Sequence, residues 1–250
     1  MIIIFFIFGL IVGSFLNAVI FRLHSGESFL LGRSHCMHCK HELAPLDLVP
    51  VFSFIFLSGK CRYCKSKLSW QYPIVEFLTG LIFAVLFAQG QMPLISPKFL
   101  FELVMAGFFI VVGVFDLKHY LILDKVVFPG LVVVLIYNIF AGQIFLGLIS
   151  GFGVAGFFLL QYVFSKGKWI GFGDVKFGLL LGNFASWPMS LVLIMLAYFL
   201  GAIVGIVLIL SGKKKLGSKL PFGVFLSASA IITMIIGERL LTWYLRLIGL

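Results

Sequence analysis

Apolar stretches long enough to cross a lipid bilayer recur along almost the whole 250-residue chain. Crossing the hydrocarbon core as a helix takes about 20 mostly apolar residues. Eight stretches approach this length, the fourth and sixth being short: 2–21, 73–90, 99–115, 126–141, 144–164, 174–187, 188–210 and 221–245. Hydrophobic residues make up 62% of the chain and charged residues only 11%, which excludes an ordinary soluble domain.

The lack of hydrogen-bond partners for the backbone in a bilayer limits the possible fold classes. Only helices and closed barrels satisfy all backbone hydrogen bonds in lipid. The apolar stretches lack the two-residue alternation of a barrel strand, so they predict an all-α membrane bundle of about eight helices. No small-residue cleavage site follows the first stretch, which favours a retained helix over a signal peptide. We expect a first span at 1–22, a polar loop at 23–72 and the rest of the bundle at 73–250.

The positions of the basic residues predict the orientation. Sixteen of the 19 Lys and Arg residues fall after the first, third, fifth and seventh stretches, which places all four connections on one side. Cationic loops remain in the cytoplasm, so this side is the cytoplasmic one. The net charge of +10 matches the anionic lipid of the inner leaflet and requires no nucleic-acid partner. No internal repeat at a fixed period is evident.

All four cysteines lie in the polar loop, as two C-x-x-C pairs. The pairs are Cys36 with Cys39 and Cys61 with Cys64, and about 20 residues separate them. This spacing predicts a structural zinc site with four thiolate ligands. Disulfides would not persist in a reducing cytoplasmic loop. Four unrelated free thiols are the alternative, and the histidines of the loop are expected to be exposed bystanders.

Two aspartates stand at the ends of apolar stretches. Asp116 follows an apolar run, and Asp174 opens another one directly after Gly171-Phe172-Gly173. By the predicted orientation both lie at the cytoplasmic ends of their helices, where they can face each other. Two carboxyl groups that share one proton provide a general base and a general acid, which is the chemistry of an aspartic peptidase. The glycines reduce bulk and are expected to allow unusual dihedral angles, so that a substrate strand can approach.

Each of these acidic residues also has a purely structural explanation. Asp174 could cap a helix, and Asp116 could sit exposed at a helix end. Asp124 is interpreted as a solvated carboxylate or a cap. Glu76 could interact with a helix dipole. Glu102 and Lys98 have the spacing of an ion pair within a helix.

Several motifs, taken together, resemble the type IV prepilin peptidases along nearly the whole chain. In chain order they are Gly13-Ser14-Phe15-Leu16-Asn17 before Arg22, Gly32-Arg33-Ser34-His35-Cys36, Leu48-Val49-Pro50, Gly59-Lys60-Cys61-Arg62-Tyr63-Cys64, Tyr72-Pro73 with Glu76, Gly171-Phe172-Gly173-Asp174-Val175-Lys176, and Leu220-Pro221-Phe222-Gly223.

The resemblance implies a bacterial inner-membrane aspartic endopeptidase whose active site faces the cytoplasm. Asp116 and Asp174 would be catalytic, and Gly171, Gly173 and Lys176 would position the substrate. That substrate would be a prepilin or pseudopilin with a short basic leader. Many members also methylate the new N-terminal amine with S-adenosylmethionine, so the resemblance makes Glu76 a candidate for methyl transfer. Membrane lipid is the other expected partner, and Lys176 could also contact its phosphates.

One departure from the family pattern affects the loop after Asp116. The family commonly has a proline before the second aspartate of this region, whereas Leu123 precedes Asp124 here. Three alternatives remain at this point. They are a peptidase that has lost methylation or acts on archaeal preflagellin-like substrates, a proton-relaying transporter with carboxylates near the bilayer midplane, and a zinc-containing scaffold without catalysis.

Overall fold

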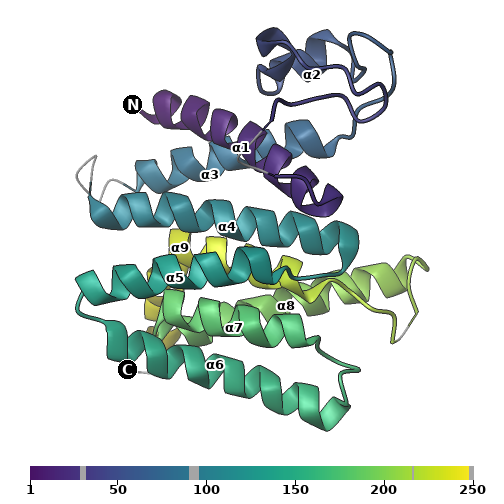
Figure 1. Ribbon diagram of the computed structural model, residues 1–250. Helices are drawn as coiled ribbons and strands as arrows, with labels where there is room; N and C mark the ends of the chain where they lie inside the picture. The colour runs from purple at the N-terminus through teal and green to yellow at the C-terminus, as the bar shows by residue number, and fades with distance from the viewer. Residues whose placement is uncertain (29–31, 90–95, 216, 248–250) are drawn as a thin grey trace. The chain divides into compact units, whose positions relative to one another are not determined.

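The computed structural model describes residues 1–28, 32–89, 96–215 and 217–247 (Figure 1). Residues 29–31 of the predicted loop, residue 90 of the second predicted span and residues 248–250 therefore lie outside the described part. The described helices are α1 (Ile2–Ser25), α2 (Phe52–Phe56), α3 (Gln71–Ala88), α4 (Pro97–His119), α5 (Asp124–Phe140), α6 (Ile144–Ser165), α7 (Phe172–Ala185), α8 (Met189–Leu210) and α9 (Phe222–Leu247), with a short 3₁₀ turn at Pro45–Leu48.

The predicted all-α class is confirmed over the described residues, where β-structure is limited to two isolated bridges. Six of the described helices, α1, α3, α4, α6, α8 and α9, are long and apolar enough to cross a membrane. Helices α5 and α7 have 17 and 14 residues, so the count of eight spans stays a prediction. The chain is thus a multi-pass membrane protein.

The chain forms two compact units, Met1–Val111 and Val112–Leu250, and the division falls within α4. In the first unit α1 and α3 pack closely because small residues face each other. A Cβ atom added at Gly9 would lie 2.7 Å from the Cα atom of Gly80, and one at Gly13 would lie 2.7 Å from the Cα atom of Glu76. Glycines four residues apart allow such close approach between membrane helices.

The ion pair predicted between Lys98 and Glu102 in α4 is confirmed, with 3.9 Å between Nζ and Oε1.

The second unit repeats this packing between α6 and α7. A Cβ atom at Gly182 would lie 2.5 Å from the backbone oxygen of Ser150, so only glycine fits at this contact. Asn138 of α5 donates a hydrogen bond of 3.0 Å to the backbone oxygen of Asn183 and connects α5 to α7. Side chains on the outside are large and apolar, and Phe140 is 87% exposed, as expected for a surface that contacts lipid.

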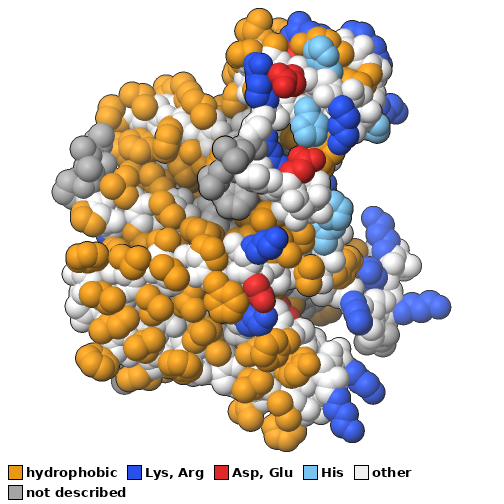
Figure 2. All heavy atoms as spheres, in the orientation of Figure 1, with side chains coloured by type: hydrophobic (Ala, Val, Ile, Leu, Met, Phe, Trp, Pro, Cys, Tyr) orange, Lys and Arg blue, Asp and Glu red, His pale blue; other side chains and the backbone are white. Residues whose placement is uncertain are grey.

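The space-filling view shows the corresponding distribution of charge (Figure 2). In residues 112–250, hydrophobic side chains cover the broad sides of the helices. Lysines gather at the end where α6 connects to α7 and α8 to α9. This asymmetry agrees with the clustering of basic residues in alternate connections that the sequence shows.

Candidate functional site

Both aspartates are buried and both lie at helix ends within the second unit. Asp116 is three residues from the end of α4 and is 4% exposed. Asp174 is the third residue of α7 and is 8% exposed. A buried carboxyl group is costly unless hydrogen bonds or a function compensate for its desolvation.

Each carboxyl group accepts backbone hydrogen bonds at the start of a helix. The N–H of Gly171 donates to Oδ2 of Asp174 at 2.9 Å, which is the contact that the third helical residue of a capping box makes with the N-cap backbone. The N–H of Val224, in the first turn of α9, donates to Oδ2 of Asp116 at 3.2 Å, and the backbone of Gly223 donates to the same carboxyl group. Both buried carboxyl groups are therefore held in place by backbone donors.

The surroundings of the two aspartates meet at Ile122 of the α4–α5 connection. A Cβ atom at Gly173, the neighbour of Asp174, would lie 3.0 Å from Cβ of Ile122. A Cβ atom at Gly223 would lie 2.9 Å from Oδ2 of Asp116 and 3.0 Å from Cδ1 of Ile122. The two aspartates that the sequence singled out are thus linked through one shared neighbour.

The glycines beside Asp174 do not have the unusual backbone that we expected. Gly171 has φ −80°, and neither it nor Gly173 is among the glycines with positive φ, so this prediction was wrong. Their value here is space, because Gly173 lies against Ile122 and Gly171 faces the carboxyl group of Asp174.

Lys176 has a partner that sequence reasoning did not identify. Its Nζ atom lies 2.8 and 2.7 Å from the two carboxylate oxygens of Asp124, the first residue of α5. Asp124 is therefore ion-paired, while its side chain remains exposed to solvent, in agreement with its interpretation as a solvated carboxylate. The pair joins the beginnings of α5 and α7, two residues from Asp174.

The four cysteines form the predicted cluster. Their sulfur atoms all lie within 4.8 Å of one another, and those of Cys36 and Cys64 are 3.8 Å apart. In a tetrahedral site with Zn–S bonds of about 2.3 Å, sulfurs lie about 3.8 Å apart. The donor set and its spacing therefore fit zinc. Within the described residues no histidine belongs to this cluster, in agreement with the prediction that the histidines are bystanders.

Each cysteine pair lies on its own hairpin, and the two hairpins have the same conformation. In the first hairpin the N–H of Cys36 donates to the oxygen of His41, and in the second the N–H of Cys61 donates to that of Ser66. Lys40 and Lys65 both have positive φ, near 59° and 58°. This offset of 25 residues is a short internal repeat that the sequence analysis missed, although Cys-x-x-Cys-Lys occurs twice.

Two of the thiols, Cys64 and Cys39, have pKa values shifted in opposite directions. Hydrogen bonds from Ser66 lower the pKa of Cys64 to about 6. A backbone hydrogen bond from His41 stabilises the thiolate of Cys39, but burial and the neighbouring thiols outweigh it and raise the pKa of Cys39 to about 11. Four adjacent thiolates repel one another, and a divalent cation is the natural means of holding them together.

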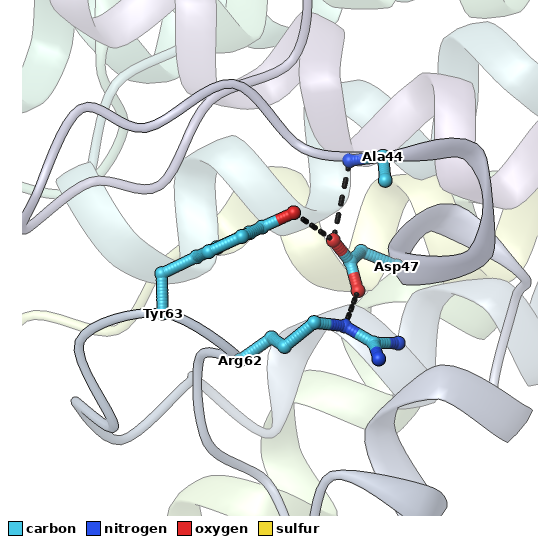
Figure 3. Close-up of polar contacts among 4 residues, drawn as sticks. All are labelled: Ala44, Asp47, Arg62 and Tyr63. Atoms are coloured by element: carbon cyan, nitrogen blue, oxygen red, sulfur yellow. Dashed lines mark hydrogen bonds and ion pairs between the residues drawn. The ribbon is translucent and has the colours of Figure 1, made fainter.

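Asp47 lies outside the cluster and stabilises the second hairpin through hydrogen bonds (Figure 3). It accepts hydrogen bonds from Arg62 at 2.6 Å, from the hydroxyl of Tyr63 at 3.3 Å and from the backbone of Ala44 at 3.2 Å. Burial alone would raise the pKa of Asp47, but the hydrogen bond from Arg62 and its charge hold that pKa below the usual value. Because Arg62 and Tyr63 separate Cys61 from Cys64, the network orients two ligands.

Glu76 lies on α3, in the first unit, and is 6% exposed. It accepts a hydrogen bond of 2.7 Å from the backbone of Val51 and another from the side chain of Ser14. These contacts hold Glu76 beside the cysteine-bearing loop, and no described basic residue forms an ion pair with it.

Comparisons with known proteins place these features in a family. Residues 7–90 match the bacterial peptidase A24 N-terminal domain, and residues 103–206 match the type IV leader peptidase family. The chain is 29% identical to a protein named prepilin leader peptidase/N-methyltransferase from Aeromonas hydrophila, over 96% of this chain and 92% of that protein.

Two further relatives carry the same name. The chain is 28% identical to the Bacillus subtilis (strain 168) protein, with 97% of each chain covered. It is 33% identical to the Myxococcus xanthus (strain DK1622) protein, over 82% of this chain and 62% of that one. No solved structure matches the chain significantly. The two family matches and the full-length relatives lead to one conclusion: the chain belongs to the type IV leader peptidase family.

Proposed function

We propose that this protein removes the leader of a type IV prepilin or pseudopilin and methylates the new N-terminal amine with S-adenosylmethionine. The observation that carries the peptidase activity is the pair of buried carboxyl groups of Asp116 and Asp174, each held by backbone donors at a helix end. Relatives that match almost the whole chain are named for both activities.

In this mechanism the two aspartates exchange protons with the reacting atoms. The ionised carboxylate takes a proton from water as the water oxygen bonds to the carbonyl carbon of the scissile peptide. The protonated carboxyl group then gives its proton to the leaving nitrogen as the C–N bond breaks. One shared proton suffices, because two nearby carboxylates do not both ionise readily. Gly171 and Gly173 would leave room for the substrate backbone, and Lys176 would position the site through Asp124.

The position of the aspartates favours a peptidase over a transporter. A proton relay would place its carboxylates near the bilayer midplane, in interrupted helices. Asp116 is close to the C-terminal end of α4 and Asp174 to the N-terminal end of α7. Basic residues in alternate connections support an active site at the cytoplasmic face of a bacterial inner membrane.

The remaining assignments complete the proposal. Cys36, Cys39, Cys61 and Cys64 would hold a structural zinc ion within the cytoplasmic loop at 23–72, between the first span at 1–22 and the bundle at 73–250. S-adenosylmethionine would supply a methyl group from its sulfonium, with the C–S electron pair passing to sulfur as the amine nitrogen bonds to carbon. Membrane lipid would surround the bundle and deliver a substrate that is itself a membrane protein.

Incubating the purified protein with a prepilin and S-adenosylmethionine tests both activities at once. The product mass should fall by the mass of the leader and rise by one methyl group. Cleavage without methylation would support the peptidase activity and refute the methyltransferase activity. An unchanged substrate would refute both.

Substituting Gly223 by Ala should slow leader cleavage. The added Cβ atom would lie 2.9 Å from Oδ2 of Asp116 and must displace that carboxyl group. A displacement of about 1 Å in a catalytic group can lower the rate roughly 100-fold, so a loss of roughly 10- to 100-fold is expected in initial rates. Gly153→Ala is the matched control, because its Cβ atom meets nothing within 4 Å. Equal rates for the two variants would show that Gly223 does not hold Asp116 in place.

A further inference from the structure

A pocket in the first unit lies between α1, the cysteine-bearing loop and the beginning of α3. Its volume is about 130 Å³. Aromatic and apolar side chains form much of the wall, among them Phe21, Phe54, Leu48 and Tyr72. Pockets with aromatic and apolar walls and a few polar groups are the usual form of small-molecule sites. The aspartates of the second unit take no part in it.

Glu76 contributes a buried carboxyl group to this pocket. Its two protein hydrogen bonds come from neutral donors, the backbone of Val51 and the side chain of Ser14. The pocket's arginines are engaged elsewhere, since Arg22 donates to the backbone of Ser28 and Gly32, and Arg62 pairs with Asp47. Among the described residues, Glu76 thus has no cationic partner. An unpaired buried carboxylate favours a ligand that carries positive charge.

The backbone segments that contact Glu76 and its helix fix the position of this side chain. Val51, which donates the hydrogen bond at 2.7 Å, has φ 62° and ψ −50°. A β-branched residue rarely adopts positive φ, and such strain persists where the surroundings impose it. On the other side, Asn17 of α1 donates to the backbone oxygen of Tyr72 and accepts from Gln71, which fixes the first turn of α3. Glu76 is therefore held from two directions.

We propose that this pocket binds the methyl donor, with the carboxylate of Glu76 facing its sulfonium cation. The inference rests on the proposed methyltransferase function and adds a location and a recognition mechanism to it. Aromatic side chains such as Phe21 and Tyr72 suit the flat adenine ring, and they also favour a nearby cation. A substrate ammonium group has the same charge, but aromatic walls match a small heteroaromatic molecule better than the end of a protein helix.

Binding of charged and neutral forms of the donor separates this role from a structural one. S-adenosylmethionine carries a sulfonium, whereas S-adenosylhomocysteine has a neutral thioether in its place. Glu76→Gln keeps the size and the acceptor oxygen but removes the charge. We expect this variant to bind S-adenosylmethionine roughly tenfold or more weakly, because a buried charge pair has lost one partner. Its affinity for S-adenosylhomocysteine should change about twofold or less, since that ligand has no sulfonium.

Equilibrium binding of both ligands to the full-length protein in detergent provides the measurement. Glu102→Gln is the matched control, because it removes another carboxylate from a helix of the same unit. Crosslinking of radiolabelled S-adenosylmethionine by ultraviolet light, followed by peptide mapping, should label the peptides that contain Phe21 or Tyr72. Labelling confined to residues outside the pocket would overturn the assignment.

The other outcomes are equally decisive. If Glu76→Gln weakens both ligands equally, or neither, Glu76 does not recognise the sulfonium and the inference fails while methylation stands. If the wild-type protein cleaves the leader but binds neither ligand and transfers no methyl group, the methyltransferase half of the proposed function fails as well.

Discussion

Asp116→Asn and Asp174→Asn should each abolish leader cleavage while the protein remains folded in the membrane. Asparagine has nearly the same shape and can still accept the hydrogen bonds from Val224 and Gly171. It can neither take a proton from water nor give one to the leaving amine. General acid or base catalysis contributes roughly 10²–10⁴-fold, and both groups are needed to complete the reaction, so each substitution should cost at least this much.

Initial rates of leader removal, measured by mass spectrometry on purified variants, give the test. Glu238→Gln is a suitable control, because Glu238 is an exposed carboxylate on α9 of the same unit. Zinc content and elution as a single species in detergent would show that the variants are folded. If both asparagine variants kept near-normal rates, the aspartates could not be the catalytic pair.

Cys36→Ser should release zinc and unfold the cysteine module, defined by residues 34–68. The sulfur of Cys36 is buried within the cluster, so a serine hydroxyl leaves the metal with three thiolates. Structural zinc contributes about 10–16 kcal/mol of binding free energy in small zinc-finger peptides at neutral pH. The module has little apolar core of its own, since only Cys36, Phe54 and Cys61 are buried hydrophobic residues there. The metal is therefore expected to supply most of its stability.

Metal analysis of the purified variant should show a fall from about one zinc per chain to almost none. Limited proteolysis should then cut the module, and a strong chelator should produce the same pattern in the wild-type protein. His38→Ala is the matched control, because His38 is exposed between the two cysteines and is outside the cluster. Unchanged zinc in Cys36→Ser would rule out the four-thiolate site.

Much of the fold could be predicted because hydrophobicity over about 20 residues is a local property. The first predicted span, 2–21, corresponds to α1 at Ile2–Ser25, and the fourth, 126–141, corresponds to α5 at Asp124–Phe140. The cysteine cluster could be predicted equally well, because the spacing within each pair places two thiolates on one tight turn. The repeat of the hairpin was missed although its letters are visible, since it is much shorter than a structural repeat unit.

The environment of the aspartates could not be predicted in the same way. Val224 is 108 residues from Asp116, and Asp124 is 52 residues from Lys176. Contacts at such separations leave no periodic trace in one sequence. The prediction of unusual dihedral angles at Gly171 and Gly173 was wrong because the sequence does not show which side chains pack against these glycines. A Cβ atom at Gly173 would crowd Ile122, 51 residues away in the chain, whereas one at Gly171 would crowd the nearby Asp174 side chain.

The amino-acid sequence alone determined that this protein is a helical membrane protein with a four-cysteine module and two acidic residues at helix ends. These properties depend on local composition and spacing, which set the hydrophobic free energy of each segment. Only the tertiary structure decided which backbone groups donate to Asp116 and Asp174, what Lys176 pairs with, and that Glu76 faces a pocket with no cationic partner among the described residues. Burial and hydrogen bonding depend on neighbours that are remote in the chain, so packing has to be known before they can be assigned.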